Sequence, residues 1–130
     1  MRDRLIAGAM VPATLVIQAQ KFRRWYRNAV LALFRDVDAI IAPATPCTAP
    51  KLGQKTFLLG DAELPVRPNL GIFTQPISFI GLPVAAVPLP GKLPIAVQVI
   101  AAPWREDVCL RIARHLEATG VAVAQRPPEA

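Results

Sequence analysis

The sequence predicts an α/β fold in which a mainly apolar sheet is flanked by helices. Three observations predict this class. A long stripe of apolar residues at helical spacing opens the chain of 130 residues, short apolar runs typical of buried strands follow, and a second long helical pattern closes it. We therefore expect a single domain, residues 1–130, in which helices pack against strands.

The first expected element is a long amphipathic helix from Pro12 to about Phe34. Proline suits the first turn of a helix, where its missing N–H would have no partner anyway. Lys21, Arg24 and Arg27 occupy the side opposite the apolar stripe and predict a basic, solvent-facing surface. The stripe alternates spacings of four and three and consists of Leu15, Ala19, Phe22, Tyr26, Ala29 and Leu33.

A short apolar run, Ala39–Ala42, predicts a buried strand that is stopped by the prolines following it. Residues 51–70 mix glycine, proline and charge without a period, which indicates a long surface excursion with room for a short hairpin. A short helix over Gly71–Ile80 is expected to end at Gly81, because glycine adopts the left-handed cap conformation without strain.

The C-terminal third predicts two strands and a helix. The apolar runs Val84–Leu89 and Ile95–Ala102 indicate strands of a sheet that is covered on both faces. The last helix opens with two acidic residues and ends at Gly120. Its apolar face consists of Val108, Ile112, Ala113 and Leu116. A short strand or tail is expected over 121–123, and the polar segment 124–130 is expected to fray.

Composition limits the classes of partner. Hydrophobic residues make up 53% of the chain and charged residues 18%, more apolar than a small free-standing domain needs, which indicates burial against something outside the chain. The net charge of +6 does not predict a nucleic-acid partner, because the basic face of the first helix explains it and no known binding module accompanies it. Without a long uncharged apolar window or a signal-peptide core, we expect a cytoplasmic protein with no membrane partner.

The residues alone do not assemble a reaction centre. Ser78 is the only serine, and a triad with His115 and a carboxylate is possible by count but has no support from spacing. We expect His115 to be a partly buried structural residue at the edge of the last helix's apolar face. Cys47 has no basic neighbour to activate it, and Cys109 falls at core spacing. We therefore expect no catalytic residue, no metal site and no cofactor.

Several motifs, taken in their order along the chain, resemble those of a known family. The segments are “FRDVDAIIAPATP” after the long helix, “FTQPISFIGLP”, a strand ending in proline, “LPIAVQ”, and a last helix that opens with acid. In this order they resemble the C-terminal part of the amidase signature family of serine amidohydrolases. The resemblance covers nearly the whole chain. It implies a partial mixed sheet with flanking helices, a C-terminal piece of the amidase signature α/β/α fold.

The resemblance also implies a chemistry. That family hydrolyses amide C–N bonds through an acyl-enzyme, with a lysine and two serines from a Gly/Ser-rich signature. This signature does not occur in the sequence, so no catalytic role can be carried over to any residue. The chain is therefore predicted to be inactive alone, as the C-terminal portion of a larger hydrolase.

The segments “PATPCTAPKLGQ” and “IAAPWRED” are most similar to the biuret and carboxybiuret hydrolase branch, which implies a ureido, biuret-type or other small amide substrate. A glutamine-using branch carries an acid where this chain has Gly71, which favours a substrate without a free α-amino group. Because the family's equivalent helix lies near the substrate channel, the resemblance implies substrate-binding roles for Gly71, Ile72, Phe73, Thr74, Gln75 and Ser78. An alternative of equal weight is that Thr74 and Ser78 only bond to their own helix backbone.

The same resemblance implies a partner. Exposed strand edges and bare apolar faces are liabilities in isolation. We therefore expect either a missing N-terminal amidase half or self-association through the exposed sheet. The alternative function is a stand-alone, non-catalytic structural or interaction module derived from the amidase fold.

Overall fold

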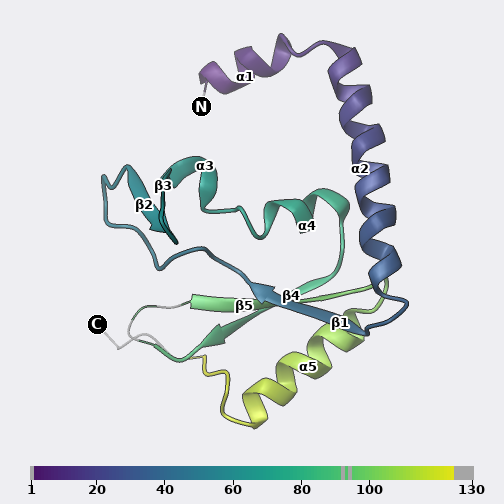
Figure 1. The fold of residues 1–130 in the computed structure, drawn as a ribbon, viewed down its shortest axis with the longest axis vertical. Coiled ribbons are helices and arrows are strands. Elements are labelled where there is room, and N and C mark those ends of the chain that lie inside the picture. Colours follow the sequence, from purple (N-terminus) through teal and green to yellow (C-terminus); the bar gives the residue numbers. More distant parts are fainter. Residues whose placement is uncertain (1, 92, 94, 125–130) are drawn as a thin grey trace.

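The computed structural model describes residues 2–91, 93 and 95–124 (Figure 1). The polar segment that we expect to fray lies outside the described residues from position 125 onward. The helices of the described part are α1 (Arg2–Ala9), α2 (Ala13–Leu33), α3 (Val66–Asn69), α4 (Gln75–Ile80) and α5 (Glu106–Ala118). Its strands are β1 (Ala39–Pro43), β2 (Thr56–Leu59), β3 (Ala62–Pro65), β4 (Val84–Leu89) and β5 (Ile95–Ala101).

The main sheet has three strands in the order β1-β5-β4. Both neighbours pair with β5 antiparallel, so that Ile100 lies opposite Ile40 on one side and Val84 on the other. A separate antiparallel hairpin joins β2 and β3. The predicted α/β class is confirmed. All pairs among the described strands are antiparallel, so the parallel pairs of the expected mixed sheet are not among them.

Side chains alternate across β5 and build a core on each face of the sheet. Val99 and Ala101 face α5. Val99 packs against Ile112, and Ala101 packs with Val108 and Cys109. Ile100 faces the other side, where it packs with Ile80 of α4 and with the C-terminal end of α2 (Figure 1). The prediction of a sheet covered on both faces therefore holds for β5.

The same prediction is wrong for β4. Ala85 and Val87 face α5, whereas Val84 and Ala86, which alternate with them, are exposed. The layer formed by α2 and α4 covers the sheet around Ile100 and does not extend over these two side chains. β4 is thus an edge strand with one covered face.

The predicted bounds of the long helix are confirmed, but its apolar face is wrong. Pro12 is the N-cap and Phe34 the C-cap of α2. The side chains that reach the core are those of Tyr26, Val30, Leu31 and Phe34. All members of the predicted stripe except Tyr26 are exposed, because only the C-terminal part of α2 lies over the sheet (Figure 1).

A helix that the sequence pattern did not predict precedes it. α1 has no buried residue and meets α2 at an angle of 94°. No single helix in the described part of the chain has both the length and the apolar composition to cross a membrane. α1 and α2 together satisfy that test by length and composition only, across their bend.

The middle segment contains the predicted hairpin, β2 and β3, followed by α3. The next helix starts later than predicted: residues 71–74 form a turn, and α4 begins at Gln75 with Pro76 in its first turn. Proline there has no N–H to donate to a preceding turn, so the helix does not extend back to Gly71. No strand forms over 121–123; instead the Ala122 N–H donates to the Leu116 carbonyl.

The predicted cap at Gly81 is confirmed, with φ 65° and ψ 53°. We expect Gly81→Ala to lower the free energy of unfolding by about 1–2 kcal/mol in urea denaturation, because an L side chain is strained in this conformation. A Cβ at this position would meet nothing closer than 3.9 Å, so crowding does not add to the cost.

Gly8→Ala is the matched control, because Gly8 lies in α1 with open space around it. It should cause no loss of stability, since alanine is the better helix former. Equal losses in the two variants would contradict a conformational origin at Gly81.

Candidate functional site

The six predicted substrate-binding residues lie in the turn 71–74 and in α4. Two of them line a groove, and the other four do not. Ile72 and Gln75 line an open groove of about 700 Å³. Phe73 and Thr74 are half-buried, and Ser78 is exposed. The Thr74 hydroxyl donates to the Gly71 carbonyl at 3.4 Å, as expected if it serves only the local backbone. The segment therefore presents two of the six to the groove.

The groove is formed by three helices. Phe22 of α2 stacks on Tyr26 with ring centroids 6.2 Å apart and lies 6.4 Å from Phe79 of α4. Pro68 and Asn69 of α3 line it together with Pro76. The walls are thus aromatic and aliphatic, and their side-chain hydrogen-bonding groups are the amides of Asn69 and Gln75 and the hydroxyl of Tyr26. Such a groove suits a flat, weakly polar ligand or an apolar side chain.

Gly71 has a steric role in this arrangement. A Cβ built on it would lie 2.8 Å from Nε2 and 2.9 Å from Cγ of Gln75. The Gln75 side chain folds back over the turn and uses the space that any other residue at position 71 would fill. The glycine therefore permits the observed orientation of Gln75.

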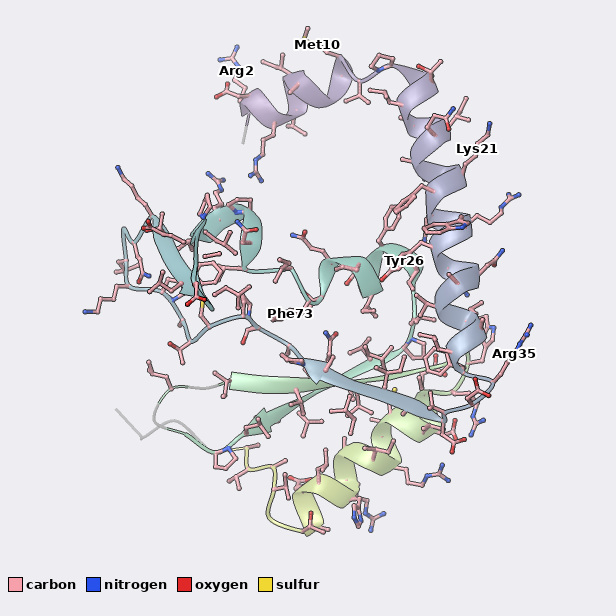
Figure 2. All side chains as sticks on the ribbon, in the orientation of Figure 1. Arg2, Met10, Lys21, Tyr26, Arg35 and Phe73 are labelled. Carbon is pink, nitrogen blue, oxygen red and sulfur yellow. The ribbon has the colours of Figure 1, made fainter. Side chains whose placement is uncertain are left out.

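Gln98 of β5 is a site residue that the sequence analysis missed. Its side chain is 2% exposed, and its Nε2 donates to the Phe73 carbonyl at 2.8 Å and to the Pro43 carbonyl at 2.9 Å. Figure 2 shows Phe73 on the side of α4 that faces the sheet. Two signals were available: a single polar residue inside the apolar run “IAVQVIAA”, and its place at the end of the motif “LPIAVQ”, to which no role was assigned.

Arg27 holds the other end of the segment. It was predicted to face solvent, but it is half-buried and its Nη1 donates to the carbonyls of Ile80 and, at 3.4 Å, Gly81. A cation at the C-terminus of a helix satisfies carbonyls that have no partner within the helix. Segment 71–81 is therefore fixed by one donor from β5 and one from α2.

The geometry gives no support to a triad. Ser78 lies on α4 and His115 on α5, and these helices cover opposite faces of the sheet (Figure 1). His115 is exposed rather than partly buried, because Ile112 and Leu116 pack on the sheet and His115 lies only at the edge of the face that they form. Within the described residues, no three His, Cys, Asp or Glu side chains are grouped to hold a metal ion.

Cys109 has a structural environment, as predicted. Its thiol is buried and donates to the carbonyls of Val99 at 3.3 Å and Pro83 at 3.5 Å. Burial raises the pKa of this thiol, so less thiolate forms at a given pH than in an exposed cysteine. Cys47 is free and half-buried.

The sequence profile of the Amidase family matches residues 1–110. The chain belongs to the amidase family. This amidase chain is 49% identical over 124 residues to the AtzE subunit of a 1-carboxybiuret hydrolase from Pseudomonas sp. strain ADP, covering 92% of the chain and 27% of that relative. It is 35% identical over 104 residues to a fatty acid amide hydrolase of Medicago truncatula, covering 78% of the chain and 17% of that relative.

The fold is also that of a solved amidase, on which the chain superposes with a TM-score of 0.85 at 28% identity, covering 91% of this chain and 28% of that one. A solved chain reported as part of a vestigial protein complex, which reveals the origins of an s-triazine catabolic enzyme, superposes with a TM-score of 0.87 at 48% identity. The match covers 95% of the amidase chain and 28% of the solved one. The chain therefore spans between 17% and 28% of the length of these relatives and solved chains. The predicted family is confirmed.

We expect Arg27→Met in the amidase chain to lower the free energy of unfolding by about 1.5–3 kcal/mol, because it removes hydrogen bonds from a charged donor to two backbone carbonyls. Arg24→Met makes the same chemical change at an exposed position of α2 and should stay within about 0.5 kcal/mol. Urea denaturation compares them, and an equal effect would contradict the capping role of Arg27.

The two cysteines give a prediction that depends on pH. At pH 8, iodoacetamide should modify Cys47 in the folded chain while Cys109 remains protected, as followed by mass spectrometry of peptides. Because burial raises the pKa of Cys109, its modification should increase as the pH is raised further and should be complete in urea. Equal modification of both cysteines in the folded chain at pH 8 would contradict the burial of Cys109.

Proposed function

We propose that this chain is the C-terminal part of a serine amidohydrolase that hydrolyses a ureido, biuret-type or other small amide. The observation that supports this most directly is the 49% identity with the 1-carboxybiuret hydrolase subunit over 92% of the chain. The substrate class is carried from that relative to this chain as a proposal. Residues 1–130 would form one domain of the complete protein.

The proposed reaction proceeds through an acyl-enzyme. A serine oxygen attacks the amide carbonyl, the C–N bond breaks, and the leaving nitrogen takes up a proton; water then hydrolyses the ester and restores the serine. The serines and lysine of this machinery would come from the portion of the relatives that the chain does not span. This chain alone would be inactive.

Within that enzyme, segment 71–78 would form part of the substrate wall. The supporting features are the groove against Ile72 and Gln75 and the fixation of the segment from both ends. Gly71 offers no carboxylate to a substrate ammonium group, which supports a substrate without a free α-amino group. Thr74 and Ser78 have no contact with the groove, so their predicted roles would require the complete site.

Large apolar side chains that are exposed to solvent support the proposal that a partner covers this chain. Leu15 and Trp25 on α2 are more than half exposed, and Trp104 is 89% exposed with a left-handed φ of 64°. Such a conformation is strained for an aromatic residue and persists where the surroundings hold it. An N-terminal amidase half, or a second copy of the chain, would cover these side chains in a cytoplasmic assembly.

The second candidate is a stand-alone, non-catalytic structural or interaction module. The sequence observation in its favour is the single serine, Ser78, which is exposed and lies on the opposite face of the sheet from His115. The two candidates differ in whether the chain can complete an amidase.

A chimera tests the proposal. The matched C-terminal part of the Pseudomonas 1-carboxybiuret hydrolase subunit is replaced by this chain, and ammonia release from 1-carboxybiuret is measured. We expect hydrolysis by the chimera and none by the 130-residue chain alone, because the chain supplies walls and packing but no nucleophile.

Two controls decide the outcome. Ser78→Ala in the chimera should leave kcat within about threefold of the parent chimera, since Ser78 is expected to take no part in the acyl transfer. A chimera that folds with native-like circular dichroism and hydrolyses nothing would favour the non-catalytic module. Hydrolysis by the isolated chain that is lost on Ser78→Ala would show that Ser78 is a nucleophile after all.

A further inference from the structure

Gln98 is a buried polar side chain with a specific pair of partners. It lies on the central strand β5, on the face opposite α5, and is 2% exposed. A buried amide without partners is costly, and Gln98 avoids this cost by donating both N–H groups to backbone carbonyls. One carbonyl belongs to Pro43 at the end of β1 and the other to Phe73. The amide thus joins three segments that are distant in sequence.

The turn 71–74 depends on this connection. Its other hydrogen bonds are local: the amides of Thr74 and Gln75 both donate to the Gly71 carbonyl, at 3.1 and 2.7 Å. Among the hydrogen bonds of the described residues, the bond from Gln98 to Phe73 is the one that joins this turn to the sheet. Without it, no hydrogen bond among the described residues ties the turn to β1 or β5.

We propose that Gln98 is a positioning residue for substrate binding. Its amide fixes the backbone at Phe73, and this sets the direction in which Ile72 and Gln75, on either side of it in sequence, face the groove. Gln98 itself is buried beneath the turn with both donors engaged, so it acts through the backbone and does not touch substrate. This role rests on the proposed function, because it affects catalysis only if segment 71–75 lines the substrate site.

Hydrogen exchange of the 130-residue chain tests the structural half. Gln98→Met keeps the length of the side chain and removes both donors. We expect the amides of Thr74 and Gln75 to exchange about tenfold faster or more relative to those of Val99 and Ile100 in β5. Gln54→Met, at an exposed glutamine with local bonds, should leave this ratio unchanged. An equal acceleration of all four amides would show only a general loss of stability and overturn the proposal.

Kinetics of the chimera test the functional half. Gln98→Met should raise KM about tenfold and leave kcat within about threefold, because a displaced substrate wall weakens binding more than acyl transfer. An unchanged KM with selective exchange of the turn would overturn the link to substrate. If the parent chimera is inactive, the proposed function fails, while the exchange ratio still decides whether Gln98 holds the turn.

A second variant keeps the test decisive if Gln98→Met does not fold. If Gln98→Met does not give native-like circular dichroism, Gln98→Asn replaces it, because asparagine keeps the donors on a shorter side chain that cannot reach both carbonyls. The same criteria apply: a selective gain in exchange at Thr74 and Gln75 with a raised KM supports the proposal, and the absence of either overturns it.

Discussion

One buried amide connects the parts on which the candidate site depends. Gln98 sits at the centre of the sheet and donates to a carbonyl at the end of β1 and to another in the turn before α4. The turn pairs with no strand of the sheet. Its position relative to the end of β1 is therefore set by the Gln98 side chain and not by strand pairing. An apolar residue in its place would leave two carbonyls under the turn without these donors.

Arg27 completes the arrangement from the opposite end. Its guanidinium bonds to the carbonyls at the end of α4, where Gly81 turns the chain toward β4. Arg27 comes from α2, the same helix that contributes Phe22 and Tyr26 to the groove. The packing of α2 against the sheet therefore positions two features at once. It places the aromatic wall of the groove, and it places Arg27 at the end of α4.

Much of the fold was predictable because its signals are local. The ends of α2, the strands β1, β4 and β5 and the left-handed Gly81 follow from apolar runs and from the backbone chemistry of proline and glycine. For residues 51–70 the sequence indicated only a surface excursion with room for a short hairpin. The apolar face of α2 did not follow, since a periodic stripe does not reveal which part of a helix lies over a sheet. In the site, Ile72 and Gln75 were predicted through a family resemblance. Gln98 was missed because a lone polar residue in a strand shows that a partner exists without identifying it.

The two hydrogen bonds of Gln98 also affect the order in which parts of the chain fold during synthesis. The acceptor at Phe73 precedes its donor by 25 residues and the acceptor at Pro43 by 55. During synthesis, both carbonyls are added to the chain before Gln98 exists. The turn can then be compact only through its own short-range bonds, and its final orientation is acquired when β5 emerges and inserts between β1 and β4. The wall that this turn gives to the groove is therefore among the last features of the chain to become native.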